Sequence, residues 1–164
     1  MSETTSPEKL GWSSPRLRLR VLGTSLLLAF LCYAFFTWVL WPVKVTGDSM
    51  MPNYHNDSRH FINKLAYWSG KPRRGEVIGL RAGGGEIYIK RVVGLPGERV
   101  SFEDGRILIN GQLLEEPYID SKIPWTELEP VTLGPDDYYV IGDNRATSVL
   151  GPVPFDRFIG RVLF

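Results

Sequence analysis

Two residues of this sequence could act together as a nucleophile and its base. Ser49 lies in the stretch TGDSMMP, where Met50 and Pro52 are expected to fix a turn that presents the hydroxyl. Lys90 lies in the apolar run EIYIKRVV, whose alternation indicates a strand. Burial would lower the pKa of this lysine from about 10.4 toward neutrality, and its uncharged amine could take the proton of a serine. A lysine that reaches solvent at a strand edge is the alternative interpretation.

Other catalytic chemistries have less support in the sequence. His55 and His60 are the only histidines, and their spacing matches neither a metal-binding HExxH motif nor a recognisable triad. Cys32 is the only cysteine, which excludes an intrachain disulfide and a thiolate metal cluster. A net charge of +1 excludes the overall basic field that nucleic-acid binders use. We therefore expect no metal, no cofactor and no nucleic acid; spacing alone cannot test paired carboxylates.

The serine follows an apolar run that could cross a membrane. Val21–Val43 contains no charged residue and is long enough, as a helix, to span the hydrocarbon core. A cleaved secretory signal is disfavoured because the run is too long and no small-residue cleavage site follows it. A buried core helix is disfavoured because every face is apolar. Basic residues precede the run at positions 9, 16, 18 and 20, whereas only Lys44 follows closely, which predicts a cytoplasmic N-terminus.

The residues after the run are typical of a compact, mostly antiparallel β-domain. Short alternating segments are separated by turn signals, including the hairpin dipeptide Asn110-Gly111 and the AGGGE turn at 82–86. We expect a tail over 1–20, a transmembrane helix over 21–43 and an extracytoplasmic β-domain over 44–164. The predicted strands are His60–Asn63, Glu76–Leu80, Glu86–Val93, Arg99–Phe102, Arg106–Asn110, Gln112–Leu114, Tyr138–Ile141 and Phe158–Leu163.

Four segments in order after one apolar run resemble the bacterial type I signal peptidases, also called leader peptidases. They are TGDSMMP, RRGEVIGL, YIKRVVGLPGERV and VIGDNRATS. The resemblance implies a serine–lysine protease with Ser49 as nucleophile, Lys90 as general base and Ser148 as the serine that orients the lysine. It also implies an oxyanion hole at the Ser49 N–H, with the Gly47 backbone as a possible second donor. The residues expected to support the site are Arg91, Asp143, Asn144 and Arg145.

The chain departs from the family pattern after Ser148. The family continues through an Asp-Ser-Arg portion, whereas here Gly151-Pro152-Val153 follows about four residues early. Asp156 and Arg157 come later in the sequence. This difference affects the part of the family site that holds the lysine against Ser148.

The resemblance implies a membrane-bound serine endopeptidase of the bacterial cytoplasmic membrane. Its partners would be the lipid bilayer and exported preproteins, from which it would remove signal peptides after small residues. Met50, Tyr88 and Ile89 are the candidate substrate-binding residues, beside an extended substrate. Two alternatives are a dedicated peptidase for one pilin or conjugation substrate, and a membrane-tethered β-module that does not cut.

Overall fold

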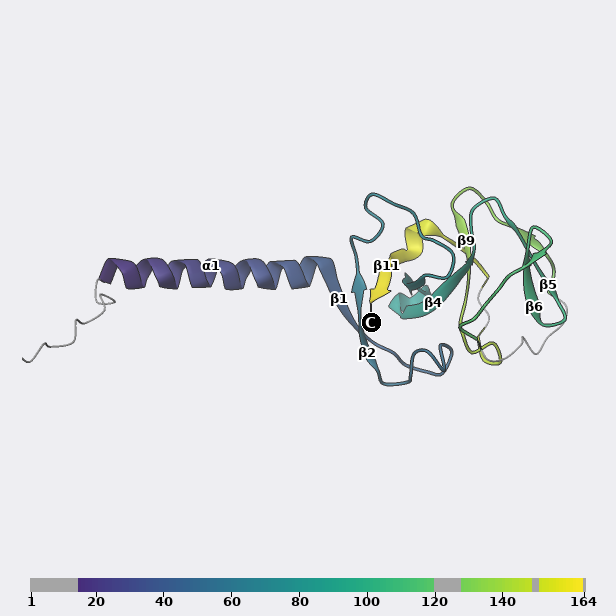
Figure 1. Cartoon of the computed structure of the whole chain (residues 1–164), viewed down its shortest axis with the longest axis horizontal. Coiled ribbons are helices and arrows are strands. Elements are labelled where there is room, and N and C mark those ends of the chain that lie inside the picture. Colours follow the sequence, from purple (N-terminus) through teal and green to yellow (C-terminus); the bar gives the residue numbers. More distant parts are fainter. Residues whose placement is uncertain (1–14, 120–127, 149–150, 164) are drawn as a thin grey trace, which may run out of the picture. The chain divides into compact units, whose positions relative to one another are not determined.

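The computed structural model describes residues 15–119, 128–148 and 151–163. The chain divides into two compact units, Met1–Trp38 and Val39–Phe164. Among the described residues, one helix lies almost wholly in the first unit, and the second contains two antiparallel sheets (Figure 1). The predicted fold class, one apolar N-terminal helix followed by an antiparallel β-domain, is confirmed.

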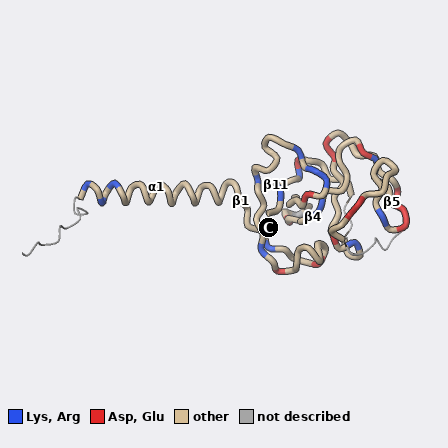
Figure 2. The backbone as a smooth tube through the Cα atoms, in the orientation of Figure 1, with Lys and Arg blue, Asp and Glu red and all other residues tan. Residues whose placement is uncertain are grey.

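Helix α1 runs over Pro15–Val39 and has the length and composition of a membrane span. Proline suits the first helical position because its missing N–H has no partner there in any helix. Basic residues are confined to the first turns, and no charged residue follows them along α1 (Figure 2). The hydroxyls of Thr24 and Thr37 donate to the carbonyls of Arg20 and Tyr33, which satisfies both groups without water.

The helix ends four residues before the predicted end of the apolar run. Leu40–Lys44 forms strand β1, which pairs antiparallel with β2 (Arg59–Asn63). Pro42 lacks an N–H donor, and it is tolerated because β1 lies at the edge of its sheet. The sequence pattern did not separate this strand from the span because both are apolar.

The larger sheet holds the predicted lysine strand near its middle. Its seven strands are all antiparallel, in the order β1-β2-β11-β3-β4-β9-β10. Figure 1 shows β4 lying between β2 on one side and β9 on the other. Beyond β2, the bounds are β3 Val77–Arg81, β4 Ile87–Gly94, β9 Asp137–Ile141, β10 Pro152–Pro154 and β11 Phe158–Leu163.

A smaller sheet of four strands, ordered β7-β6-β5-β8, forms the end of the domain beyond β9 (Figure 1). Its bounds are β5 Arg99–Glu103, β6 Arg106–Ile109, β7 Gln112–Leu113 and β8 Val131–Thr132. Asn110 and Gly111 have φ of 52° and 81°, as expected for the predicted two-residue hairpin turn. Asp104 and Gly105, with φ of 48° and 72°, make the same kind of turn between β5 and β6.

Three apolar clusters hold these sheets together and two of them bear on the site. One joins the small sheet to β4 and β9, and contains Val93, Val100, Ile107, Ile109, Leu133, Tyr139 and Ile141. Another ties the loop after β1 to the large sheet, and contains Val45, Met50, Tyr54, Ile62, Val77, Ile89 and Val162. Met50 is 1% exposed, and burial of such a side chain stabilises the fold by roughly 1.5–3 kcal/mol. The loop that carries Ser49 is therefore anchored by its own neighbour.

All eight predicted strands are present, each within one residue of its predicted ends. Strands β1, β8 and β10 were missed. The AGGGE segment forms a turn between β3 and β4, with a 3-10 helix, η1, over Gly83–Gly85. A second 3-10 helix, η2, covers Phe155–Arg157 before β11.

Candidate active site

The structure brings together three residues that are far apart in the sequence. The Lys90 Nζ lies 2.7 Å from the Ser49 Oγ and 2.7 Å from the Ser148 Oγ. Lys90 projects from β4, Ser49 from the loop between β1 and β2, and Ser148 from the loop after β9. Both contacts are of hydrogen-bond length, so the amine can exchange a proton with Ser49 while Ser148 fixes its position.

The surroundings of Lys90 favour the uncharged amine. The side chain is 5% exposed, and this burial lowers the pKa of Lys90 to about 8. The negative charge of Asp143 opposes the shift but is the smaller effect. Burial of an amine disfavours its charged form, because low-dielectric surroundings replace its hydration shell.

A glycine leaves the space in which the serines meet. A Cβ on Gly142 would lie 2.1 Å from the Ser49 carbonyl oxygen and 2.4 Å from the Ser148 Oγ. The Gly142 N–H donates to the Ser148 Oγ at 3.1 Å, and this buried bond fixes that hydroxyl. Asn144 holds the loop of Ser49, since its N–H donates to the Ser49 carbonyl and its Nδ2 to the Asp48 carbonyl, both at 3.1 Å.

A buried ion pair connects the strand of Lys90 with the loop of Ser148. Arg91 donates from Nε and Nη2 to the two carboxylate oxygens of Asp143, at 2.8 and 2.6 Å. Its Nη1 donates to the Gly75 carbonyl at 2.7 Å, and the Asn53 Nδ2 donates to Asp143 at 2.9 Å. The Asp143 side chain is fully buried, and these donors compensate the hydration that its carboxylate group loses.

A second buried ion pair holds the same loop from outside the large sheet. The guanidinium of Arg145 is fully buried and forms two bonds with the carboxylate of Glu116, and its Nε donates to the Gly142 carbonyl at 3.1 Å. The Tyr118 Oη donates to Glu116 at 2.8 Å. The expected supporting residues Arg91, Asp143, Asn144 and Arg145 all contact the loops that carry the two serines or the strand that carries the lysine.

Two predicted site residues do not have the expected surroundings. Met50 was a candidate for the substrate pocket, but it is buried in an apolar cluster and supports the loop from below. Gly47 was a possible oxyanion donor, but its N–H donates to the Asn56 Oδ1 at 3.0 Å, in a backbone with φ of 89°. A side chain at Gly47 would be strained by that φ, so the glycine serves the shape of the loop.

The other candidate substrate residues lie on a strand edge that is partly open. Over Ile87–Arg91, β4 pairs with β3, whereas on its other side the pairing with β9 begins only at Arg91. Within the described residues, the β9-facing edge of β4 before Arg91 has no partner strand. Tyr88 is 41% exposed there, and Ile89 is buried in the cluster that contains Met50.

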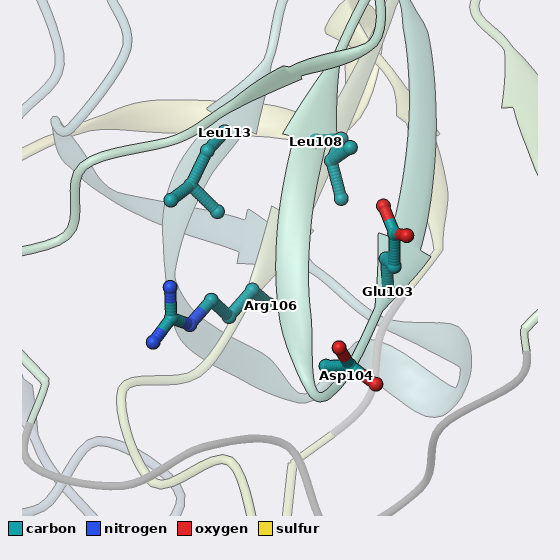
Figure 3. Close-up of a pocket in the computed structure, with 5 residues that line it drawn as sticks. All are labelled: Glu103, Asp104, Arg106, Leu108 and Leu113. Carbon is teal, nitrogen blue, oxygen red and sulfur yellow. The ribbon is translucent and has the colours of Figure 1, made fainter.

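A cavity of about 350 Å³ lies away from this site, on the small sheet. It is lined by Glu103, Asp104, Arg106, Leu108 and Leu113. Figure 3 shows the Arg106 guanidinium and the two carboxylates pointing away from one another, without a nucleophile among them. Over the part of the chain that the structure describes, no group of three or more His, Cys, Asp or Glu side chains could hold a metal ion.

Several residues that support the site were not predicted from the sequence. Asn53, Asn56 and Gly142 lie within or beside the recognised motifs, but nothing in their spacing reveals which groups they bond. Glu116 and Tyr118 lie about thirty positions from Arg145 and Arg91 in the sequence. The only available signal was an acidic and an aromatic residue around Pro117, just after a predicted strand.

A desolvated lysine amine within hydrogen-bond distance of a serine hydroxyl, on an antiparallel β-scaffold, is the arrangement of a serine hydrolase that uses lysine in place of histidine. Comparison with known proteins narrows this class. The model of the signal peptidase family, peptidase S26, matches residues 18–164. The chain belongs to this family, as the resemblance in the sequence predicted.

Individual relatives are similar over most of the chain. A signal peptidase I from Leptolyngbya laminosa is 35% identical over 158 residues, which cover 88% of this chain and 76% of the relative. Signal peptidase I T from Bacillus subtilis is 33% identical over 138 residues, 75% of this chain and 72% of the relative. The crystal structure of a signal peptidase I from Enterococcus faecalis is 27% identical, with a TM-score of 0.48, and the match covers 57% of this chain and 97% of that chain.

Proposed function

We propose that this protein is a membrane-bound endopeptidase that removes N-terminal signal peptides from exported preproteins, with Ser49 as nucleophile and Lys90 as general base. The observation that carries the proposal is the buried Lys90 amine, 2.7 Å from each of the two serine hydroxyls. Membership of the signal peptidase family supports the substrate class. No step of the proposed reaction uses a metal or an organic cofactor.

In the first half-reaction the uncharged Lys90 accepts the proton of the Ser49 hydroxyl as Oγ attacks the carbonyl carbon of the scissile peptide bond. The Ser49 N–H, which makes no hydrogen bond within the described residues, is the proposed donor to the oxyanion. The Lys90 ammonium then gives its proton to the leaving amine. The mature protein departs with a free N-terminus, and the signal peptide stays esterified to Ser49.

In the second half-reaction a water molecule attacks the ester. Lys90, neutral again, takes a proton from the water, and the new C–O bond forms as the carbonyl oxygen becomes the oxyanion. Collapse of this intermediate releases the signal peptide carboxyl group, and the Lys90 ammonium returns the proton to the Ser49 Oγ. Ser148 keeps the amine in place during both steps because its hydroxyl is itself held by the Gly142 N–H.

The unpaired edge of β4 is the proposed binding place for the substrate backbone. An extended preprotein segment can add there as a further antiparallel or parallel strand, in line with the end of β9. Tyr88 and Ile89 would flank the residues before the cleavage site.

Helix α1 is the proposed anchor in the bacterial cytoplasmic membrane, with its basic N-terminal end in the cytoplasm and the β-domain outside. Ser49 follows the last helical residue, Val39, by ten positions (49 − 39). At about 3.6 Å per residue, the chain keeps this serine within roughly 36 Å of the helix end. A preprotein still held in the membrane by its own apolar segment is thus within reach.

Cleavage of a preprotein with an Ala-x-Ala site by the full chain in detergent tests the proposal. We expect cleavage by the wild type and at least a 1,000-fold lower kcat for Ser49→Ala and for Lys90→Ala, because each removes a group that bonds or transfers a proton in the reaction. Ser69→Ala and Lys71→Ala are matched controls, since both residues are exposed in one loop away from the site. Persistent cleavage in either site variant would reject the dyad. An inactive wild type across pH values and detergents would favour the non-catalytic module.

A further inference from the structure

A short segment after β7 reaches out of the small sheet and contacts the surroundings of the dyad. The side chain of Glu116, 6% exposed, forms two hydrogen bonds with the Arg145 guanidinium, and Arg145 in turn donates to the Gly142 carbonyl. Gly142 is the residue whose N–H holds Ser148. Glu116 is therefore linked, through Arg145 and Gly142, to the Ser148 hydroxyl that contacts the lysine.

Tyr118 contacts the strand that carries Lys90 and the loop that carries Ser49. Its ring lies against the guanidinium of Arg91, with the Arg91 Cζ 4.0 Å from the ring centre. Its carbonyl accepts a bond from the Asn53 Nδ2, which also donates to Asp143. Its hydroxyl donates to Glu116 at 2.8 Å, so the two side chains act as one unit. Arg91 directly follows Lys90, and Asn53 lies in the loop of Ser49.

We propose that Glu116 and Tyr118 are positioning residues for the dyad, which hold the Arg91–Asp143 and Arg145–Gly142 contacts in place from the small sheet. The inference rests on the proposed function, since it assigns a role within that reaction. The bracing that the family's Asp-Ser-Arg portion would give after Ser148 is absent from this sequence, and contacts from a different segment hold the same loop.

The charges around Lys90 explain why Glu116 and Tyr118 affect the reaction as well as the folding. The charged and titratable side chains packed around Lys90 and its supports are Tyr54, Arg91, Glu116, Tyr118, Asp143 and Arg145. Among them Asp143 raises the pKa of Lys90, against the larger effect of burial. Arg91 neutralises Asp143 through two short bonds, and the Tyr118 ring covers the outer face of that guanidinium. Loss of the ring admits water to Arg91 and loosens its hold on Asp143.

Substitution of Tyr118 separates the ring from the hydroxyl. Tyr118→Leu removes the contact with Arg91, and we expect the midpoint of the kcat/KM profile to move up by about one pH unit, because a less neutralised Asp143 favours the charged amine. At pH 7 this is about a tenfold loss, which disappears near pH 10. Tyr118→Phe keeps the ring and is expected to keep the wild-type midpoint. The pH midpoint is obtained from relative rates within one preparation of each variant. A smaller folded fraction lowers all these rates equally and does not move the midpoint.

A double-mutant cycle tests whether Glu116 acts through Arg145. Glu116→Gln alone leaves a buried guanidinium without its carboxylate partner, and we expect kcat to fall at least about tenfold with KM little changed. In an Arg145→Met background the same substitution should have almost no further effect, since its partner is already gone. Thermal unfolding of each variant corrects the rates for the folded fraction.

The full chain in detergent serves for both experiments, with the Ala-x-Ala preprotein as substrate. The proposal is supported if the pH midpoint of kcat/KM moves up in Tyr118→Leu and if the effects of Glu116→Gln and Arg145→Met on kcat are non-additive. A loss in Tyr118→Leu that is equal at every pH, no loss at all, or multiplicative effects of Glu116→Gln and Arg145→Met would overturn it. Failure of the dyad itself is recognised separately, because cleavage would then persist in Ser49→Ala and Lys90→Ala.

Discussion

Lys90 has a buried amine whose protonation can be followed through the reaction rate. Burial lowers its pKa to about 8, and the proposed base is the uncharged form. The kcat/KM value should therefore rise about tenfold per pH unit up to about pH 8 and level off above it, as the amine loses its proton. A pH–rate profile with a preprotein substrate measures this midpoint. A rate that falls as pH rises through the same range would contradict an uncharged lysine as base.

Ser148 is the proposed orienting residue for the lysine, and its removal should affect kcat more than KM. Ser148→Ala deletes the hydroxyl that contacts the Lys90 amine at 2.7 Å and leaves the buried Gly142 N–H without its acceptor. Because the amine can then leave the position for proton transfer, we expect kcat to fall by roughly 100-fold or more. Steady-state kinetics on the folded variant separate the two parameters. A raised KM with unchanged kcat would instead assign Ser148 to substrate binding.

Gly142 offers a steric test of how closely the two serines must approach. A Cβ at this position would overlap the Ser49 carbonyl and the Ser148 hydroxyl, at 2.1 and 2.4 Å, so Gly142→Ala must displace one of the loops. We expect loss of at least 100-fold in kcat/KM, since a displacement of about 1 Å can remove that much activity. Gly70→Ala is the control, because a Cβ there meets nothing within 4 Å. Equal activity of the two variants would contradict this close approach.

At the scale of residues, the sequence predicted that Ser49, Lys90 and Ser148 belong together, and the structure brings the three side chains within hydrogen-bond distance. Their roles in the reaction stay a prediction. Ser49 and Lys90 could be singled out because their surroundings suit a nucleophile and its base and because the four family segments contain them. The partners of Arg145 could not be found, because a buried arginine requires a carboxylate but the sequence does not specify which one. Glu116 meets it only through the packing of the small sheet beside β9.

At the scale of elements, short apolar segments between turn residues predicted eight strands, including β3 and β9, which are buried at almost every position. Strands β8 and β10 were missed because they have only two and three residues and no hairpin signal beside them, whereas the equally short β7 follows the hairpin dipeptide Asn110-Gly111. β1 was missed because it continues an apolar run and contains a proline, and its strand conformation depends on pairing with β2. The order of the strands in the two sheets has no signal in the local pattern.

The open edge of β4 leads to a prediction about the substrate backbone. A segment that pairs along this edge would point its peptide N–H groups alternately toward β4 and away from it. N-methylation of successive amides before the cleavage site should therefore raise KM at every second position, each lost bond costing about 1 kcal/mol or fivefold. Kinetics on a series of singly methylated peptides measure the pattern. Equal effects at all positions would argue against strand pairing.

At the scale of the whole molecule, one chain carries both an apolar helix and a β-domain with the proposed nucleophile, Ser49, near its start. The loop of Ser49 begins directly after β1, and β1 follows the helix without a linker. A serine at this position in the chain stays close to the end of the helix whatever the angle between the two units, because the intervening residues are few. With α1 as the proposed anchor, substrate choice would be set partly by location, since soluble proteins away from the membrane would seldom meet the serine.

The proposed orientation can be tested with cysteine labelling in whole cells or oriented vesicles. Cys32, the single native cysteine, is first replaced by alanine, and a new cysteine is placed at Trp68, which is 84% exposed on the β-domain, or at Ser6 before the helix. We expect a membrane-impermeant maleimide to label Trp68→Cys from outside, and to label Ser6→Cys only after permeabilisation, because the basic residues before the helix favour the cytoplasm. The reverse pattern would put the serine on the wrong side of the membrane for exported substrates. Labelling of both sites without permeabilisation would mean that the helix does not span the bilayer, and the proposal of a membrane-tethered peptidase would then fail even if the dyad is active in detergent.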